Sequence, residues 1–206
     1  MKIPAKFRLI YADPPWRFDN RANRGSPDYN LGGSAKRAKS AYSTMTLDDI
    51  CDMPVSSVCE PDALLALWAP WAMVLGDGKG ISPAMRVCEA WGFEPKTAIP
   101  WVKGRWDGDN LKLHIGLGNY IRVASEVLIL ARLGKFRIPP SDRLPGILSP
   151  RTRHSAKPEV TRDFLETLVN GPYAELFARS ARPGWDLWGN QAPAPSEYLS
   201  SVLGGF

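Results

Sequence analysis

The tetrapeptide Asp13-Pro14-Pro15-Trp16 combines residue types that suit chemistry on an aromatic amino group. Such a group is a poor nucleophile, because its lone pair is delocalised into the ring. Acceptors that take hydrogen bonds from both amino hydrogens favour a pyramidal nitrogen and direct its lone pair at an electrophile. Asp13 supplies a carboxylate acceptor. Proline has no N–H, has a fixed φ and restricts the residue before it, so the carbonyl of Pro14 can be a rigid second acceptor.

Trp16 offers a flat face on which an extruded base can stack, an interaction worth roughly 1–3 kcal/mol. An enzyme of this kind must take the base out of a duplex or act on a single strand. The alternative is that the tetrapeptide is only a sharp turn after a strand, with Trp16 in the core. The surrounding sequence favours the catalytic interpretation, because the tetrapeptide ends a buried strand and precedes a basic loop.

The elements that must position these residues follow from apolar runs, capping residues and turn residues. Strands that are apolar throughout, separated by helices, predict one α/β domain with a mainly parallel sheet covered on both faces. A length of 206 residues suits a single domain, with a peripheral tail over 192–206. The expected strands are 7–12, 63–68, 97–102, 125–131, 173–177 and 185–188, and the expected helices begin near Thr46, Ser82 and Lys157.

Several polar residues follow the predicted strands. Ligands of such sheets bind beyond the carboxyl ends of the strands, so we expect Asp13, Arg179 and Asn190 to converge on one site. Lys157 opens a predicted helix, where its charge and the helix dipole together suit a carboxylate. The alternatives are a surface ion pair for the arginine, a turn cap for the asparagine and a solvated lysine. For Glu126, which opens a buried strand, the alternative is an edge charge held by a neighbouring arginine.

Two long loops are rich in basic residues. Both leave the carboxyl ends of predicted strands, so they should rim the same cleft, where basic loops suit contacts with phosphates. The alternative is two solvated loops. The first loop, 17–41, carries Arg17, Arg21, Arg24, Lys36, Arg37 and Lys39, and the second, 132–155, carries Arg132, Lys135, Arg137, Arg143, Arg151 and Arg153.

Composition narrows the class of protein. The net charge of +5 permits a polyanionic partner. Cys51, Cys59 and Cys88 form no C-x-x-C pair, which favours free thiols in a reducing cytoplasm, and two histidines are too few for most metal sites. No apolar run approaches the roughly 18 residues of a membrane span, and we expect no signal peptide. We therefore expect a cytoplasmic protein with no metal.

With these residues in hand, the chain resembles the MT-A70 family of adenine methyltransferases, from about Phe7 to Gln191. Each motif alone is weak, but their order and separations together are specific. The landmarks are Asp13-Pro14-Pro15-Trp16, Tyr42-Ser43-Thr44-Met45, Leu67-Trp68, Trp91-Gly92-Phe93, Trp101-Val102-Lys103, Glu126, His154-Ser155-Ala156-Lys157-Pro158, Glu175-Leu176-Phe177-Ala178-Arg179 and Gly189-Asn190-Gln191.

The resemblance implies an enzyme that depends on S-adenosylmethionine. It also implies a Rossmann-like fold in permuted order, in which the catalytic strand comes first and the cofactor-binding strands are C-terminal. It places Asp13 beside both cofactor and target amine. It implies that Lys157 meets the methionine carboxylate, that Phe177 and Arg179 line the ribose region, and that Asn190 and Gln191 meet the ribose and adenine. It implies that four further residues either contact the substrate or shape the site: Tyr42, Trp101, Lys103 and Glu126.

The chain departs from the family pattern after Arg179. Better-known eukaryotic members have Pro-His-Asn there, whereas this chain has Ser180-Ala181-Arg182, which puts the ribose contacts at these positions in question. Compactness favours a bacterial or phage member, hence a DNA-adenine N6 methyltransferase, with RNA as the alternative substrate and a homodimer plausible. The rival hypotheses are a non-catalytic nucleic-acid-binding subunit, disfavoured by the intact tetrapeptide, and a methyltransferase for a small amine, whose loops would not need this charge.

Overall fold

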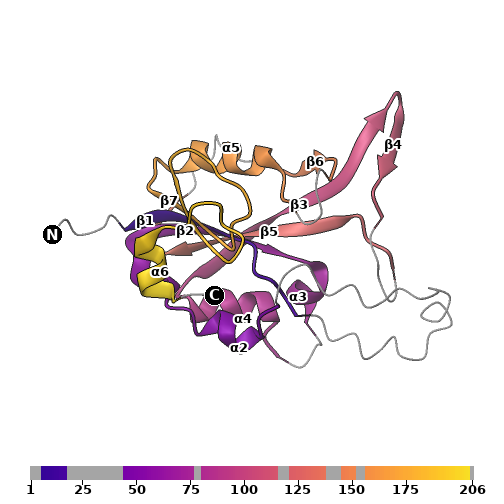
Figure 1. Ribbon diagram of the computed structural model, residues 1–206. Coiled ribbons are helices and arrows are strands. Elements are labelled where there is room, and N and C mark those ends of the chain that lie inside the picture. Colours follow the sequence, from indigo (N-terminus) through magenta and orange to yellow (C-terminus); the bar gives the residue numbers. More distant parts are fainter. Residues whose placement is uncertain are drawn as a thin grey trace, which may run out of the picture.

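The computed structural model describes residues 6–17, 44–76, 80–115, 121–137, 145–151 and 156–204. These residues form a mixed sheet with helices on both faces (Figure 1). The strands are β1 (Phe7–Ala12), β2 (Cys59–Ala69), β3 (Glu94–Asp107), β4 (Asn110–Leu113), β5 (Ser125–Leu133), β6 (Ile147–Ser149), β7 (Tyr173–Leu176) and β8 (Trp185–Trp188). The helices are α2 (Leu47–Cys51), α3 (Trp71–Leu75), α4 (Pro83–Ala90), α5 (Glu159–Leu168) and α6 (Glu197–Leu203), with a 3-10 helix at Val55–Val58.

All six predicted strands are present, and the three predicted helices begin where their capping signals lie. Thr46 caps α2 with a capping box, in which its side chain and that of Asp49 each accept from the other's backbone N–H. Ser82 precedes α4, with Pro83 as its first residue. The sequence did not predict β4, β6, α3 or α6. The segment 132–155 was predicted as a loop, but it contains the end of β5 and all of β6.

The expectation of a mainly parallel sheet is only half correct. The strand order is β4-β3-β5-β2-β1-β7-β8, with β6 paired to β3. Strands β2, β1, β7 and β8 are parallel, whereas β5 runs antiparallel to both β2 and β3, and β4 antiparallel to β3. The apolar run in β5 indicates that this strand is buried on both faces of the sheet. Burial does not determine the direction of a strand, so the run could not predict that β5 is antiparallel.

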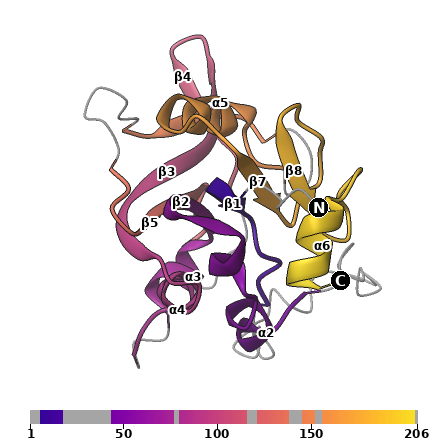
Figure 2. The ribbon, with the colours of Figure 1, turned by 90° about the vertical axis from the view of Figure 1, so that its left-hand side faces the viewer.

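Each face of the sheet carries its own apolar core, because successive side chains of a strand point to opposite faces. Figure 2 shows α5 on one face and α2, α3 and α4 on the other. Ile10 belongs to the core beneath α4 and Leu9 to the core beneath α5. Trp68 and Trp91, both expected in the core, are fully buried, and each indole N–H has an acceptor: the Tyr11 hydroxyl at 2.7 Å and the Ile50 carbonyl at 2.8 Å.

The pairing of β1 with β7 fixes which residues meet at the carboxyl edge. The two strands are parallel, with Ala12 opposite Leu176. Asp13, the first residue after β1, therefore lies beside the residues that follow β7. Its backbone N–H donates to the Leu176 carbonyl at 3.5 Å. Strand β8 lies on the far side of β7, so the turn at Asn190 is one strand further along the same edge.

The backbone that follows β7 and the backbone that follows β8 approach each other so closely that one of them requires a glycine. Phe177 has φ +62°, in the left-handed region that aromatic residues rarely adopt. Gly189 has φ +140°, and a Cβ there would lie 2.9 Å from the Cα of Phe177. The two backbones pass so closely that no other residue fits without a shift of the Phe177 backbone.

Replacing Gly189 with alanine should therefore destabilise the protein by roughly 3 kcal/mol or more, because backbone strain adds to a steric clash. Gly184→Ala is the matched control, since Gly184 also has a positive φ but no atom within 4 Å of its Cβ position. It should cost about 1 kcal/mol. Urea unfolding measures both, and equal losses would contradict the close approach.

Candidate active site

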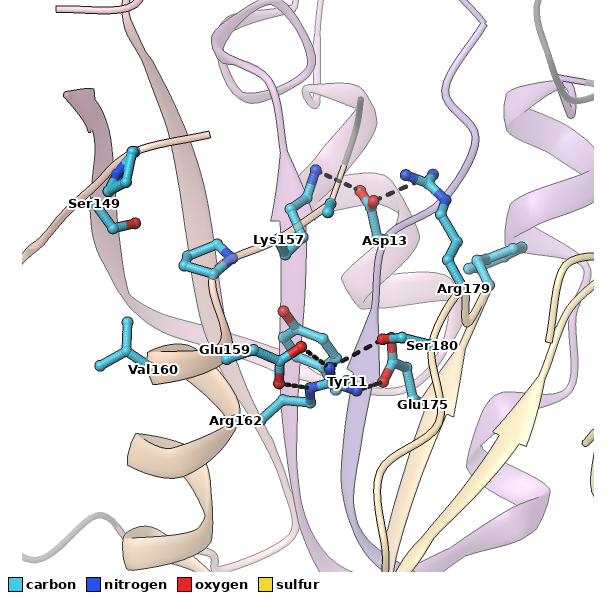
Figure 3. Close-up of a pocket in the computed structure, with 14 residues that line it drawn as sticks. Tyr11, Asp13, Ser149, Lys157, Glu159, Val160, Arg162, Glu175, Arg179 and Ser180 are labelled. Atoms are coloured by element: carbon cyan, nitrogen blue, oxygen red, sulfur yellow. Dashed lines mark hydrogen bonds and ion pairs between the residues drawn. The ribbon is translucent and has the colours of Figure 1, made fainter. Parts of the chain in front are cut away.

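A cavity of about 540 Å³ opens beyond the carboxyl ends of β1 and β7, beside the first turn of α5 (Figure 3). This is the edge at which open α/β sheets bind ligands. Four residues that the sequence predicted for the site line this cavity. Buried charged residues that the sequence did not predict line it as well. The first four are Asp13, Lys157, Phe177 and Arg179, and the additional residues include Arg162 and Glu175.

The carboxylate of Asp13 is held between two cations. Lys157 Nζ lies 2.9 Å from Oδ1, and Arg179 Nη2 lies 3.3 Å from Oδ2. The side chain of Asp13 is 16% exposed, so the ion pairs form in a partly desolvated place where electrostatic attraction is stronger than in water. Figure 3 shows the two cations reaching Asp13 from opposite sides. Of the three residues predicted to converge on one site, Asp13 and Arg179 meet in the structure, whereas Asn190 does not line the cavity.

Lys157 also joins Asp13 to Glu126. Its Nζ lies 2.8 Å from Glu126 Oε2, while Lys103 binds the other carboxylate oxygen. Burial would raise the pKa of Glu126, but the two lysines outweigh it and hold the pKa below its usual value. Burial would lower the pKa of Lys157, but Asp13 and Glu126 raise it. Glu126 is thus held by neighbouring cations, as its alternative interpretation required, although these are lysines and not an arginine.

Counted with Arg179, this chain of ion pairs contains three cations and two carboxylates, so it carries an excess positive charge. Aromatic rings flank two of the cations. Lys157 Nζ lies 5.4 Å from the centre of the Trp68 ring, and Lys103 Nζ lies 5.0 Å from that of Trp101. The Trp101 ring is buried, and its N–H donates to the Ser149 carbonyl at 3.2 Å. The site is therefore a rigid, slightly cationic arrangement suited to an anionic group.

The tetrapeptide is anchored through its backbone and its tryptophan. The Pro14 carbonyl accepts the Trp16 N–H at 2.8 Å, and the Pro15 carbonyl accepts the Met45 N–H at 3.2 Å. One lone pair of the Pro14 carbonyl remains for a further donor. Trp16 is only 8% exposed and its indole N–H donates to the Trp68 carbonyl at 3.0 Å. The expectation that Trp16 offers an open stacking face is corrected: its ring belongs to the core, because its N–H finds a buried acceptor there.

The sequence did not predict a second charged layer, centred on Arg162. The guanidinium is almost fully buried and donates to Glu175 Oε2 at 2.7 Å, to Glu159 Oε2 at 3.1 Å and to Ser180 Oγ at 3.0 Å. It links α5, which follows Lys157, to the end of β7. Two signals were available: Glu175 interrupts an apolar strand, and Arg162 precedes the buried Leu165 of α5 by three residues.

Burial dominates the ionisation of this layer. It raises the pKa of Glu175 from 4.5 to about 7, because the attraction of Arg162 offsets only part of the desolvation. Burial and the nearby Glu175 also raise the pKa of Tyr11 well above its ordinary value. The Glu175 carboxyl group therefore binds its proton more tightly in the folded protein than in the unfolded chain.

The departure at Ser180-Ala181-Arg182 has a structural consequence. Ser180 lines the cavity, but Arg182 turns onto α5, where it binds Glu166 at 2.6 Å and Asp163 at 2.8 Å. The Trp185 N–H donates to the same Glu166 carboxylate at 2.7 Å. Arg182 thus ties the segment between β7 and β8 to α5 and does not line the cavity.

Of the remaining predicted residues, those that the structure describes do not line the cavity. Asn190 and Gln191 are exposed in the turn after β8 and do not line it. Arg17 is exposed at the start of the first basic loop. Arg132, which was predicted in the second basic loop, lies in β5 and binds Glu94 at 3.0 Å. The charged and aromatic residues of the predicted loops and motifs that lie outside the described ranges are Arg21, Arg24, Lys36, Arg37, Lys39, Tyr42, Arg143, Arg153 and His154.

Two negative findings concern the described ranges alone. In these ranges, no three His, Cys, Asp or Glu side chains lie together in a group that could hold a metal ion. No helix among the same residues is both long enough and apolar enough to cross a membrane.

The mixed sheet, with a charged cavity at the carboxyl ends of its parallel strands, is consistent with a Rossmann-like methyltransferase fold. The family model of MT-A70 matches residues 7–191, and the chain belongs to this family.

Three relatives indicate the range of the family. The Type II methyltransferase M.MunI of Mycoplasma sp is 28% identical over 91% of this chain and 78% of its own length. The N6-methyladenosine RNA methyltransferase MTA1 of Pyricularia oryzae is 30% identical over 89% of this chain and 46% of its own length. The N(6)-adenine-specific methyltransferase METTL4 of Mus musculus is 29% identical over 90% of this chain, which spans 37% of that protein.

The raised pKa of Glu175 predicts a pH-dependent stability. Because the folded-state pKa lies above the unfolded value, this group's stabilising contribution is complete below about pH 4.5 and is lost as the pH rises through about 7. Glu175→Gln should remove this loss, which amounts to about 3 kcal/mol at most. Urea unfolding of both proteins between pH 4.5 and 8 measures it. Glu197→Gln, at an exposed position of α6, should keep the wild-type slope, and a wild-type slope in Glu175→Gln would contradict the assignment.

Proposed function

We propose that this protein transfers a methyl group from S-adenosylmethionine to the N6 amino group of adenine in DNA. The observation that supports this most directly is the Asp13 carboxylate, held between Lys157 and Arg179 at a cavity, in a chain of the MT-A70 family. Asp13 follows β1 directly and precedes the two prolines, so its position is constrained.

The acceptors for the target amine are Asp13 and Pro14. A carboxylate has about four lone-pair sites, so Asp13 can accept an amino hydrogen while it keeps both ion pairs. The Pro14 carbonyl keeps one lone pair beside its bond to the Trp16 N–H. Acceptors fixed in this way before the substrate arrives need no reorganisation during the reaction. The extruded base must stack elsewhere than on Trp16, or Trp16 must leave its position in the core.

The residues around the cavity fit S-adenosylmethionine. A volume of about 540 Å³ lies within the range of small-molecule sites. The excess cation of the ion-pair chain suits the methionine carboxylate, and Lys157, close to the N-terminus of α5, is the residue we assign to it. When bound, the cofactor supplies an electrophilic methyl group on a sulfonium centre. We assign Phe177 and Arg179 to the ribose region, and Asn190 and Gln191 to the ribose and adenine.

Adenine in DNA is the substrate we favour, with adenine in RNA as the alternative. Of the three relatives named above, the one whose length this chain covers best is a Type II methyltransferase, which supports DNA. A relative of similar identity carries RNA methyltransferase in its name, which keeps RNA open. We assign Tyr42, Lys103 and Glu126 to the substrate side, and the buried Trp101 to shaping that side from the core. Arg17, Arg21 and Arg37 are the proposed phosphate contacts. A homodimer is compatible with this function.

Asp13→Ala should lower methyl transfer by at least about a hundredfold, because the amino group loses a preorganised acceptor. Transfer is measured with radiolabelled S-adenosylmethionine on DNA and RNA oligonucleotides of matched sequence. Glu89→Ala, at an exposed position of α4, controls for the loss of a surface carboxylate and should leave the rate unchanged. Label on neither polymer would refute the proposed function, and undiminished transfer by Asp13→Ala would refute the site.

Lys157→Met should weaken the binding of S-adenosylhomocysteine by roughly tenfold to a hundredfold, since a hydrogen bond to a charged group contributes about 1.5–3 kcal/mol. Isothermal titration calorimetry measures this without catalysis. Lys96→Met removes a lysine of β3 that is bound to Glu94, and it should bind as the wild type does. Unchanged affinity in Lys157→Met would remove this lysine from the cofactor site.

A further inference from the structure

The strands β3 and β4 form a two-stranded ribbon that projects beyond the body of the protein (Figure 1). The pairing of β3 with β5 ends at Val102, and residues 104–107 pair only with residues 110–113 of β4. A two-stranded ribbon with both faces in solvent is marginally stable in water.

The two faces of this ribbon differ in chemistry. Trp106 pairs with Leu111 across the strands, and Leu111 and Leu113 pack over Gly104, so one face is apolar. Trp106 is 62% exposed. On the other face Arg105 lies opposite Lys112. Alternation along the strands therefore gives one apolar and one basic face.

The basic face continues the face that carries the active site. Trp101, Lys103 and Arg105 alternate along β3 and so point to the same side of the sheet. Trp101 lies in the core beneath α5, and Lys103 binds Glu126, which binds Lys157. Arg105 follows Lys103 by about 7 Å along the strand, which equals roughly two nucleotides of rise along a duplex axis.

The charges on the basic face are incompletely compensated. Like charges opposite each other in a strand pair destabilise the pair. Lys112 binds the carboxylate of Asp107, but Arg105 has no carboxylate partner within the described part of the chain. An anion bound at the pair of Arg105 and Lys112 would relieve their repulsion. Lys103, Arg105 and Lys112 form a row of cations that leads away from the candidate active site, and such a row matches a polyanion.

We propose that the basic face of the ribbon, Arg105 and Lys112, binds the sugar-phosphate backbone of the nucleic acid beside the target base. This inference rests on the proposed function, because it takes the substrate to be a polynucleotide. A two-stranded ribbon is narrow enough to enter a major groove, and its basic residues can then reach the phosphates at the rim. The alternative is that the Trp106 face of the ribbon binds a second copy of this chain. The experiment below distinguishes this alternative from binding of nucleic acid.

The test is the affinity of the full chain for a fluorescein-labelled, adenine-containing duplex, measured by anisotropy over a series of salt concentrations without cofactor. Arg105→Ala/Lys112→Ala should bind roughly tenfold more weakly and should reduce the slope of log affinity against log salt by about 2. Two single variants serve as controls and should keep both values: Arg86→Ala, a cation of α4 paired with Asp48, and Trp106→Ala on the opposite face.

Unchanged affinity and slope in the double variant would overturn the inference. So would a loss in Trp106→Ala that equals that of the double variant and accompanies dissociation of a dimer in light scattering, because the ribbon would then join two copies. Binding is measured without catalysis. Ribbon-dependent binding without methyl transfer would therefore refute only the proposed function, and methyl transfer with ribbon-independent binding would refute only this inference.

Discussion

The parallel pairing of β1 with β7 is the constraint on which the site depends. Ala12 lies opposite Leu176, so Asp13 emerges beside the backbone that leads to Arg179. These residues are far apart in the chain, and only this pairing places a carboxylate and a guanidinium 3.3 Å apart. A shift of one residue would turn every side chain of β1 to the opposite face, which the two apolar cores prevent.

The second requirement is that partly buried charges be paired. An ion removed from water costs several kcal/mol unless a partner compensates it. Asp13, Lys157 and Glu126 meet this requirement through one another, and Arg162 meets it through Glu175. Lys157 lies two residues before α5 and Arg162 lies in its first turn, so this short stretch of chain supplies one cation to each layer. The position of α5 on the sheet thereby determines the electrostatics of the cavity.

The tetrapeptide illustrates how one segment combines packing and chemistry. Trp16 is fixed in the core by its bond to Trp68, while Pro15 is tied to Met45 through its carbonyl. These contacts immobilise the backbone that carries Asp13 and Pro14. Rigidity at the acceptors thus comes from the same tryptophan that the sequence suggested as a stacking surface. Burial of that ring serves the site by holding the acceptors in place.

The sequence by itself determined six of the eight strands that the structure describes and the starts of three helices, because apolar periodicity, capping residues and proline act over a few neighbouring residues. It also placed Asp13, Lys157 and Arg179 in one site. Only the tertiary structure decided the direction of β5, the burial of Trp16 and the partners of Arg162 and Arg182. Each of these depends on contacts between segments distant in the chain, and a local pattern records that a residue is buried without recording what covers it.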